Sequence, residues 1–170
     1  MRKLILLSAA ILFLTACTAA PATLEKFEAK DAGFSILLPG KPTADSKTVD
    51  SAIGPLILNT FELNKGDTYY VISTTDYPAS VFEGTTLDEL LDSSRDGAVQ
   101  NANGTLVKEE KITIDKYSGR QLEVSVAGNQ TIKAKLALAE KRLYQIVIVG
   151  PALKMNSPEI SQVLDSFLIK

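Results

Sequence analysis

The stretch Gln121–Leu138, with the sequence QLEVSVAGNQTIKAKLAL, decides the fold that we expect for this chain. Its apolar residues fall at every second position on either side of a central turn: Leu122, Val124, Val126, Ile132, Ala134, Leu136 and Leu138. Between the two halves, Gly128-Asn129 is a two-residue signal typical of a β-hairpin. Because side chains alternate across a strand, this pattern predicts two antiparallel strands with one dry face and one wet face.

Further strands are expected on both sides of this hairpin. Leu143–Val149, which follows it, is apolar on both faces, so we expect this strand at the centre of a sheet, covered twice. Leu106–Ile114, which precedes it, alternates more loosely. Earlier in the chain, turn signals separate four more strand-like segments: Phe34–Leu38, Thr43–Ser51, Leu56–Leu63 and Tyr69–Thr75. The largely polar Thr43–Ser51 is typical of an edge strand.

Two segments have a helical period instead. Thr86 is followed three positions later by Glu89, a capping box that indicates the start of the first helix. Its apolar side is formed by Leu87, Leu90, Leu91 and Ala98. The second helix opens at Ser157-Pro158-Glu159, and its expected buried stripe is Ile160, Val163, Leu164 and Phe167. The order of strands, helix, strands and helix predicts an α+β fold, a mainly antiparallel β-sheet covered by helices.

The N-terminal segment has the plan of a secretory signal peptide. Arg2 and Lys3 precede the apolar run Leu4–Phe13, which is too short to span a bilayer. The run ends in Leu14-Thr15-Ala16-Cys17, which resembles the lipobox of bacterial lipoproteins. That resemblance implies cleavage before Cys17 and a diacylglycerol on its sulfur, with its new amino group often acylated as well. An ordinary secretory signal with a chance cysteine is the alternative.

This segment sets the expected domain organisation and location. Residues 1–16 are the expected signal peptide, 17–24 a lipidated tether, and 25–170 a single α+β domain. The tether residues Thr18–Thr23 reach only about 20 Å when fully stretched, so the domain should stay close to the membrane. We expect it on the periplasmic side of the cell envelope. Thr18 is not the aspartate associated with inner-membrane retention in enteric bacteria, which favours the outer membrane.

Composition excludes several classes of function. The chain has no histidine, so it lacks the imidazole base of Ser-His-Asp and Cys-His enzymes and all histidine metal ligands. Its one cysteine, Cys17, would be consumed by the lipid, which leaves no thiolate nucleophile or cysteine-based zinc site. A formal net charge of −2 without a basic run argues against nucleic acid as a partner. We therefore expect no cofactor and no metal.

Several short motifs carry a resemblance to a known superfamily. They are Gly33–Pro39, Tyr117–Leu122, Arg142–Ile146 and Asp165–Phe167. With the lipobox, they make the chain similar to bacterial lipoproteins of the PsbP-like superfamily, whose fold is that of the photosystem II extrinsic subunit and of the Ran-binding protein Mog. The resemblance implies a layered PsbP/Mog-like sandwich. It also implies a protein that binds or helps assemble other proteins, since members are not known as enzymes. The family's histidine metal sites have no counterpart here.

An acidic stripe, formed by Asp88, Glu89, Asp92 and Asp96, lies on the side of the first expected helix away from its leucines. It could dock a basic partner or hold calcium weakly, or it could be an ordinary solvated helix face.

Two further groups of residues invite interpretation. Tyr69, Tyr70 and Tyr77 could anchor an interface, or fill core and rim, since alternation places one of Tyr69 and Tyr70 in the core. Gly119-Arg120 could present a guanidinium to an anion. The plainer interpretation is a positive-φ glycine in a turn and an arginine at the start of a strand with its head in water.

The sequence favours a lipid-anchored, non-enzymatic envelope protein that binds a membrane-associated partner protein or assists its assembly. A photosystem II-associated lipoprotein is the narrower version if the host is photosynthetic. The alternatives are a carboxylate-based hydrolase or metal-dependent envelope enzyme that uses Asp88 and Asp92, and a purely structural envelope component.

Overall fold

The computed structural model describes residues 23–51 and 53–170. The expected signal peptide, the lipid-attachment residue Cys17 and most of the expected tether lie outside the described residues. Along the chain, the elements are β1 (Glu25–Ala29), β2 (Phe34–Leu38), β3 (Thr43–Ser51), β4 (Gly54–Lys65), β5 (Thr68–Asp76), the 3-10 helix η1 (Ala79–Phe82), α1 (Leu87–Asn101), β6 (Thr105–Ile114), β7 (Tyr117–Val126), β8 (Gln130–Ala139), β9 (Arg142–Pro151), α2 (Pro158–Asp165) and β10 (Leu168–Ile169).

A seven-stranded antiparallel sheet in the order β3-β4-β5-β9-β8-β7-β6 forms the body of the molecule. The predicted hairpin is β7–β8, in which Val124 pairs with Ile132 and Leu122 with Ala134. The apolar strand β9 lies between β5 and β8, and the polar β3 lies at an edge, as the sequence predicts. Apolar residues on both faces belong in the middle of a sheet because both faces are covered there.

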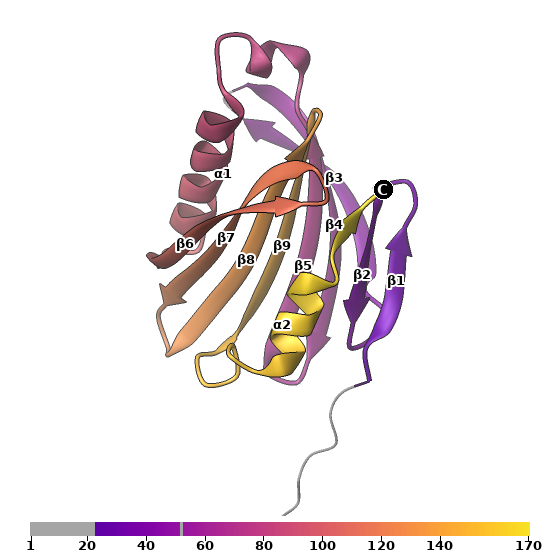
Figure 1. The fold of residues 1–170 in the computed structure, drawn as a ribbon, viewed down its shortest axis with the longest axis vertical. Helices are drawn as coiled ribbons and strands as arrows, with labels where there is room; N and C mark the ends of the chain where they lie inside the picture. Colours follow the sequence, from indigo (N-terminus) through magenta and orange to yellow (C-terminus); the bar gives the residue numbers. More distant parts are fainter. Residues whose placement is uncertain (1–22, 52) are drawn as a thin grey trace, which may run out of the picture.

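The two faces of the large sheet are covered differently (Figure 1). Helix α1 packs over β7 and β8 on one face. On the other face lie α2 and a second, three-stranded sheet in the order β1-β2-β10. The α+β class and the mainly antiparallel sheet are confirmed, with strands dominating. The expectation that helices alone cover the sheet is incomplete, because part of the cover is sheet packed on sheet.

Each covered face has its own apolar core. Between the two sheets, Phe34 packs edge-on against Phe61 with ring centroids 5.2 Å apart and lies 5.6 Å from Phe167. Under α1, the buried Leu90 and Leu91 pack on a second cluster that includes Leu122, Leu136 and Leu143. Ile160, Val163 and Leu164 of the expected α2 stripe are buried in the first core, which confirms them. Phe167 is buried there as well, but the expectation that it belongs to the helix is wrong, because α2 ends at Asp165.

The predicted start of α1 is confirmed, and its apolar side needs one correction. Thr86 is the N-cap, and its side chain and that of Glu89 form the reciprocal capping box. Leu87, however, is 49% exposed, because it lies in the first turn, one turn before the helix meets the sheet through Leu90 and Leu91. At α2, Ser157 occupies the expected N-cap position without a side-chain capping hydrogen bond.

The role expected for Gly119 is wrong. This glycine lies inside β7, and the positive φ of the preceding turn belongs to Asp115, at 54°. What requires glycine at position 119 is the neighbouring strand, since a Cβ there would stand 2.4 Å from the carbonyl oxygen of Leu136. The constraint is one of close packing, and it comes from a residue far along the chain.

Candidate functional site

The predicted acidic stripe lies along α1, and its residues have different surroundings. Glu89 belongs to the helix cap, since its carboxylate accepts a hydrogen bond from the backbone N–H of Thr86 at 2.7 Å. That bond, and a second one from the Thr86 hydroxyl, lower the pKa of Glu89 below 4.5. Asp88, Asp92 and Asp96 instead form ion pairs with basic side chains. The stripe therefore divides into a capping residue and three members of a charged cluster.

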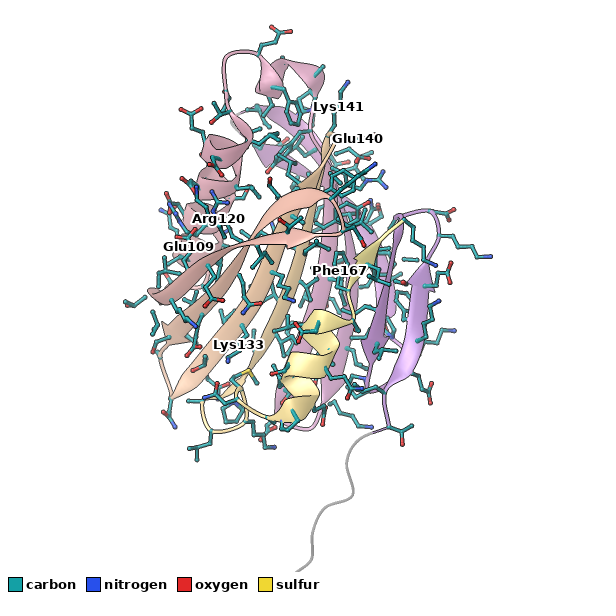
Figure 2. The ribbon with its side chains drawn as sticks, in the orientation of Figure 1. Glu109, Arg120, Lys133, Glu140, Lys141 and Phe167 are labelled. Atoms are coloured by element: carbon teal, nitrogen blue, oxygen red, sulfur yellow. The ribbon has the colours of Figure 1, made fainter. Side chains whose placement is uncertain are left out.

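Arg120 is the centre of this cluster. It lies on β7, and its side chain is 1% exposed. Its Nη2 atom donates to Asp88 at 2.8 Å and to Asp92 at 3.0 Å, while Nε lies 3.1 Å from Glu109 on β6. The expectation that the arginine head lies in water is wrong. Arg120 shares the face of β7 that α1 covers, and the helix supplies two of its three carboxylate partners (Figure 2).

Two further basic residues complete the cluster on its solvent-facing side. Arg95 on α1 donates to Asp96 at 2.8 Å and to Glu109 at 2.9 Å. Lys111 on β6 donates to the second oxygen of Asp88 at 2.9 Å. We call the seven residues the α1 charge cluster: Asp88, Asp92, Arg95, Asp96, Glu109, Lys111 and Arg120. It links α1 to β6 and β7 above the apolar core, and its three cations nearly balance its four anions.

The chemistry of the cluster follows from its pairing. Hydrogen bonds from Arg120 and then Lys111 lower the pKa of Asp88, and Arg95 does the same for Asp96. A carboxyl that acts as a general acid near neutral pH needs a raised pKa. The lowered pKa keeps Asp88 ionised near neutral pH, which weighs against a general-acid role for this residue. Residues 23–51 and 53–170 also contain no group of His, Cys, Asp or Glu side chains placed to hold a metal ion.

Sequence reasoning identified the helix carboxylates and singled out Arg120 without linking the two, and it missed Arg95, Glu109 and Lys111. One signal could have placed Arg120 beneath the helix. It has the same parity as Leu122 and Val124, so alternation alone places it on the dry face of its strand. The pairing of Lys111 with Arg120 across β6 and β7 depends on register and could not be inferred locally. Docking of a partner on the stripe remains a prediction.

The three tyrosines fill core and rim positions. Tyr70 is buried, and its hydroxyl donates to Glu159 at 3.1 Å, whereas the half-buried Tyr69 donates to Glu62. The expectation that one of the two faces the core is confirmed. Tyr77 lies 3.5 Å from Ser94 through its hydroxyl oxygen. It helps line an open, mainly apolar hollow of about 510 Å³ between α1, η1 and the tip of the β3–β4 hairpin.

A second hollow, of about 500 Å³, opens where the β8–β9 turn meets the small sheet. Glu140 and Lys141, labelled in Figure 2, help to line it, as does Arg142. The Arg142 guanidinium is already engaged, with Nη2 donating to Asp76 at 2.7 Å and Nη1 to the carbonyl of Ala32 at 3.1 Å. The bond to Ala32 joins β9 to the β1–β2 turn, and the bond to Asp76 joins it to the neighbouring strand β5. Arg142 thus serves the contact between the two sheets, and it is not a free anion-binding group.

The layered arrangement of an antiparallel sheet, a small second sheet and two helices defines a PsbP-like fold. Among solved structures, the chain is similar to cyanobacterial PsbP (CyanoP) from Synechocystis sp. PCC 6803, with a TM-score of 0.61 and 15% sequence identity over 92% of this chain and 99% of that chain. The likeness confirms the fold expected from the sequence motifs.

A protein of unknown function, PA94 from Pseudomonas aeruginosa, described as a putative regulator, is a weaker match, with a TM-score of 0.46 and 10% identity over 81% of this chain and 90% of that chain. No family model matches the chain. No curated protein matches it either. Across the described part of the chain, every helix is too short or too polar to cross a bilayer.

Proposed function

We propose that this chain is a lipid-anchored, non-enzymatic protein of the bacterial cell envelope that binds a membrane-associated partner protein or assists its assembly. The observation that carries the proposal is the single cysteine, which stands at the one position that the lipobox-like Leu14-Thr15-Ala16-Cys17 requires. Two acyl chains hold a protein stably on a membrane, so no amphipathic helix or basic patch is needed. The short tether keeps the domain within reach of other proteins on the same leaflet.

The charge cluster and the fold support the non-enzymatic part of the proposal. Asp88 and Asp92, the carboxylates of the rival enzyme hypothesis, are both bound by Arg120. The PsbP-like fold resembles that of the cyanobacterial protein CyanoP. In a photosynthetic host, this likeness favours the narrower candidate, a photosystem II-associated lipoprotein. A purely structural envelope component is the other alternative, and high copy number without a stable partner would distinguish it.

The anchoring step is tested by mass spectrometry of the protein purified from its native envelope. We expect an N-terminal Cys17 carrying diacylglycerol, and we expect Cys17→Ser to release the protein from the membrane fraction. An unmodified thiol at Cys17 in membrane-derived protein would refute the anchor.

Partner binding is tested by pull-down from detergent-solubilised envelope, with a matched pair of variants. Asp96→Asn changes an exposed carboxylate of the acidic stripe, with 70% of its side chain accessible. Asp165→Asn changes an equally exposed carboxylate on α2, 72% accessible. If a basic partner docks on the stripe, Asp96→Asn should reduce recovery of that partner and Asp165→Asn should not. Recovery of no specific protein by the lipidated wild type would count against the proposed binding function.

A further inference from the structure

The loop between β9 and α2 holds an apolar side chain out into solvent. Leu153 is 92% exposed, whereas the next most exposed large hydrophobic residue of the described chain, Val107, is 61% exposed. The loop around it is well anchored. The backbone N–H of Lys154 donates to the carbonyl of Pro151 at 2.8 Å, and that of Ala152 donates to Asn129 at 3.1 Å. Leu153 is thus displayed by a fixed loop.

Neighbouring side chains hold the same loop from both sides. Met155 is 1% exposed and belongs to the inter-sheet core. The ammonium of Lys154 lies 2.7 Å from both oxygens of Asp67, in the β4–β5 turn. Met155 is buried, and the exposed polar side chains beside Leu153 are paired, Lys154 with Asp67 and Asn156 with Lys133.

Leu153 lies at the end of the molecule where the chain enters the domain. The first residue of β1, Glu25, pairs with Leu38, the last residue of β2, and only four residues then lead into β3. The start of β3 pairs with the end of β4, next to the β4–β5 turn that Lys154 contacts. Figure 1 shows the start of β1 and the β9–α2 loop at the same lower end of the molecule.

We propose that Leu153 inserts into the interfacial layer of the phospholipid bilayer and orients the domain on it. The inference rests on the proposed lipid anchor at Cys17. Six residues lie between Cys17 and Leu24, and the seven steps from one to the other allow about 25 Å at full stretch, so the end of the molecule that carries Leu153 stays close to the membrane. The exposed Lys41 and Lys65 lie at this end as well, and the carboxylate of Asp67 is neutralised by Lys154.

The expected contribution of Leu153 to membrane binding fits a role in orienting the domain. Burial of one leucine side chain raises a partition coefficient roughly tenfold or somewhat more, far below the effect of two acyl chains. Leu153 would therefore add little to the affinity of the lipidated protein for the membrane. It would limit rotation of the domain about its tether, and it would turn the opposite end, with the β3–β4 hairpin and the apolar hollow near Tyr77, away from the bilayer.

The chain contains no tryptophan, so a single introduced tryptophan reports on one position. Leu153→Trp places the reporter in the loop. Ile53→Trp places it at the β3–β4 hairpin, a position 46% exposed at the other end of the sheet, as the matched control. The acylated variants are reconstituted into phosphatidylcholine vesicles whose acyl chains carry bromine. We expect the reporter at 153 to shift its emission to the blue and to be quenched, and the reporter at 53 to do neither.

Each outcome separates this inference from the proposed anchor. Suppose that mass spectrometry shows both variants to be acylated and that their emission is equal and unquenched. This result would overturn the role of Leu153 and leave the anchor intact. A blue shift at position 153 without bromine quenching would overturn it too, because the side chain would then be seated in protein, such as a second copy. If Cys17 proves unacylated, its free thiol is coupled to a maleimide lipid. In that sample the proposed natural anchor has failed, but the orientation can still be tested. Quenching of the tryptophan at position 153 supports the role of Leu153, and absence of quenching overturns it.

Discussion

Arg120 shows how one residue can decide the attachment of a helix. It carries a full charge on the dry face of β7 and meets carboxylates from α1 and β6. A buried charge is costly unless it is paired and hydrogen-bonded, and this one is both. Its carboxylate partners Asp88 and Asp92 remain about half exposed. The pairing therefore fixes where α1 sits, while much of the acidic stripe stays in contact with water.

We predict that Arg120→Ala lowers the free energy of unfolding by about 2–4 kcal/mol, because it removes a buried guanidinium and leaves its carboxylates facing a gap. Arg120→Met, which refills the gap without charge, should cost less. Arg95→Ala serves as the control, since its more exposed ion pairs are worth about 1 kcal/mol or less. Urea unfolding measures all three, and equal losses for Arg120→Ala and Arg95→Ala would contradict the central role of Arg120.

The tyrosines give a prediction at alkaline pH. Burial, with Glu62 as hydrogen-bond acceptor, raises the pKa of Tyr69 to about 12, and burial beside Glu159 raises that of Tyr70 further above 10. A pKa raised by folding contributes stability that is present below pH 10 and is lost as the pH rises towards 12. The free energy of unfolding should therefore fall above pH 10. Tyrosinate absorbance should also appear at higher pH in the folded protein than in denaturant, and coincident curves would refute this.

At the scale of elements, the β7–β8 hairpin was predictable and the packing around it was not. Alternation and the Gly128-Asn129 turn act between residues that are near in sequence, so the sequence showed both strands and their wet and dry faces. Gly119 shows the limit of this reasoning. The Leu136 carbonyl on the neighbouring strand leaves no room for a side chain at this position. In the sequence, a glycine required by such close packing cannot be told from a glycine required by a positive φ in a turn.

Two glycine substitutions test this difference. Gly119→Ala should lower the free energy of unfolding by about 1–3 kcal/mol, because its Cβ would press on backbone that cannot move aside. Gly97→Ala, inside α1 with open space around it, should raise that free energy by about 0.5–1 kcal/mol through better helix propensity. Thermal unfolding gives both values, and stabilisation by both substitutions would show that β7 and β8 are less closely packed than described.

At the scale of the whole molecule, an aromatic cluster joins the two sheets. Phe167 follows α2 and contacts Phe34 of the small sheet and Tyr144 of the large one, with ring centroids 5.6 Å and 5.8 Å away. The hydroxyl of Ser166 reinforces the same junction by accepting a hydrogen bond from the backbone N–H of Leu37 at 2.8 Å. The short C-terminal part of the chain therefore holds two layers together.

We predict that Phe167→Ala lowers the free energy of unfolding by about 3–5 kcal/mol, the usual cost of deleting a buried aromatic ring. The adjacent Leu168→Ala is the control, because Leu168 is 48% exposed and should cost much less. Denaturant unfolding followed by circular dichroism distinguishes the two. A cost for Phe167→Ala no larger than for Leu168→Ala would mean that the small sheet contributes little to stability.

The sequence by itself determined the strands β2 to β9, including the central β9 and the edge strand β3, the two helix starts, the capping box of α1 and the lipobox-like segment ending in Cys17. Those features depend on alternation, period and caps, which act over a few residues. Only the tertiary structure decided that β1, β2 and β10 form a separate sheet and that Arg120 is buried. Arg120 and Asp88 are 32 positions apart, and Leu37 and Ser166 are 129 apart. Contacts at such separations depend on how whole elements pack, and a local pattern carries no record of that.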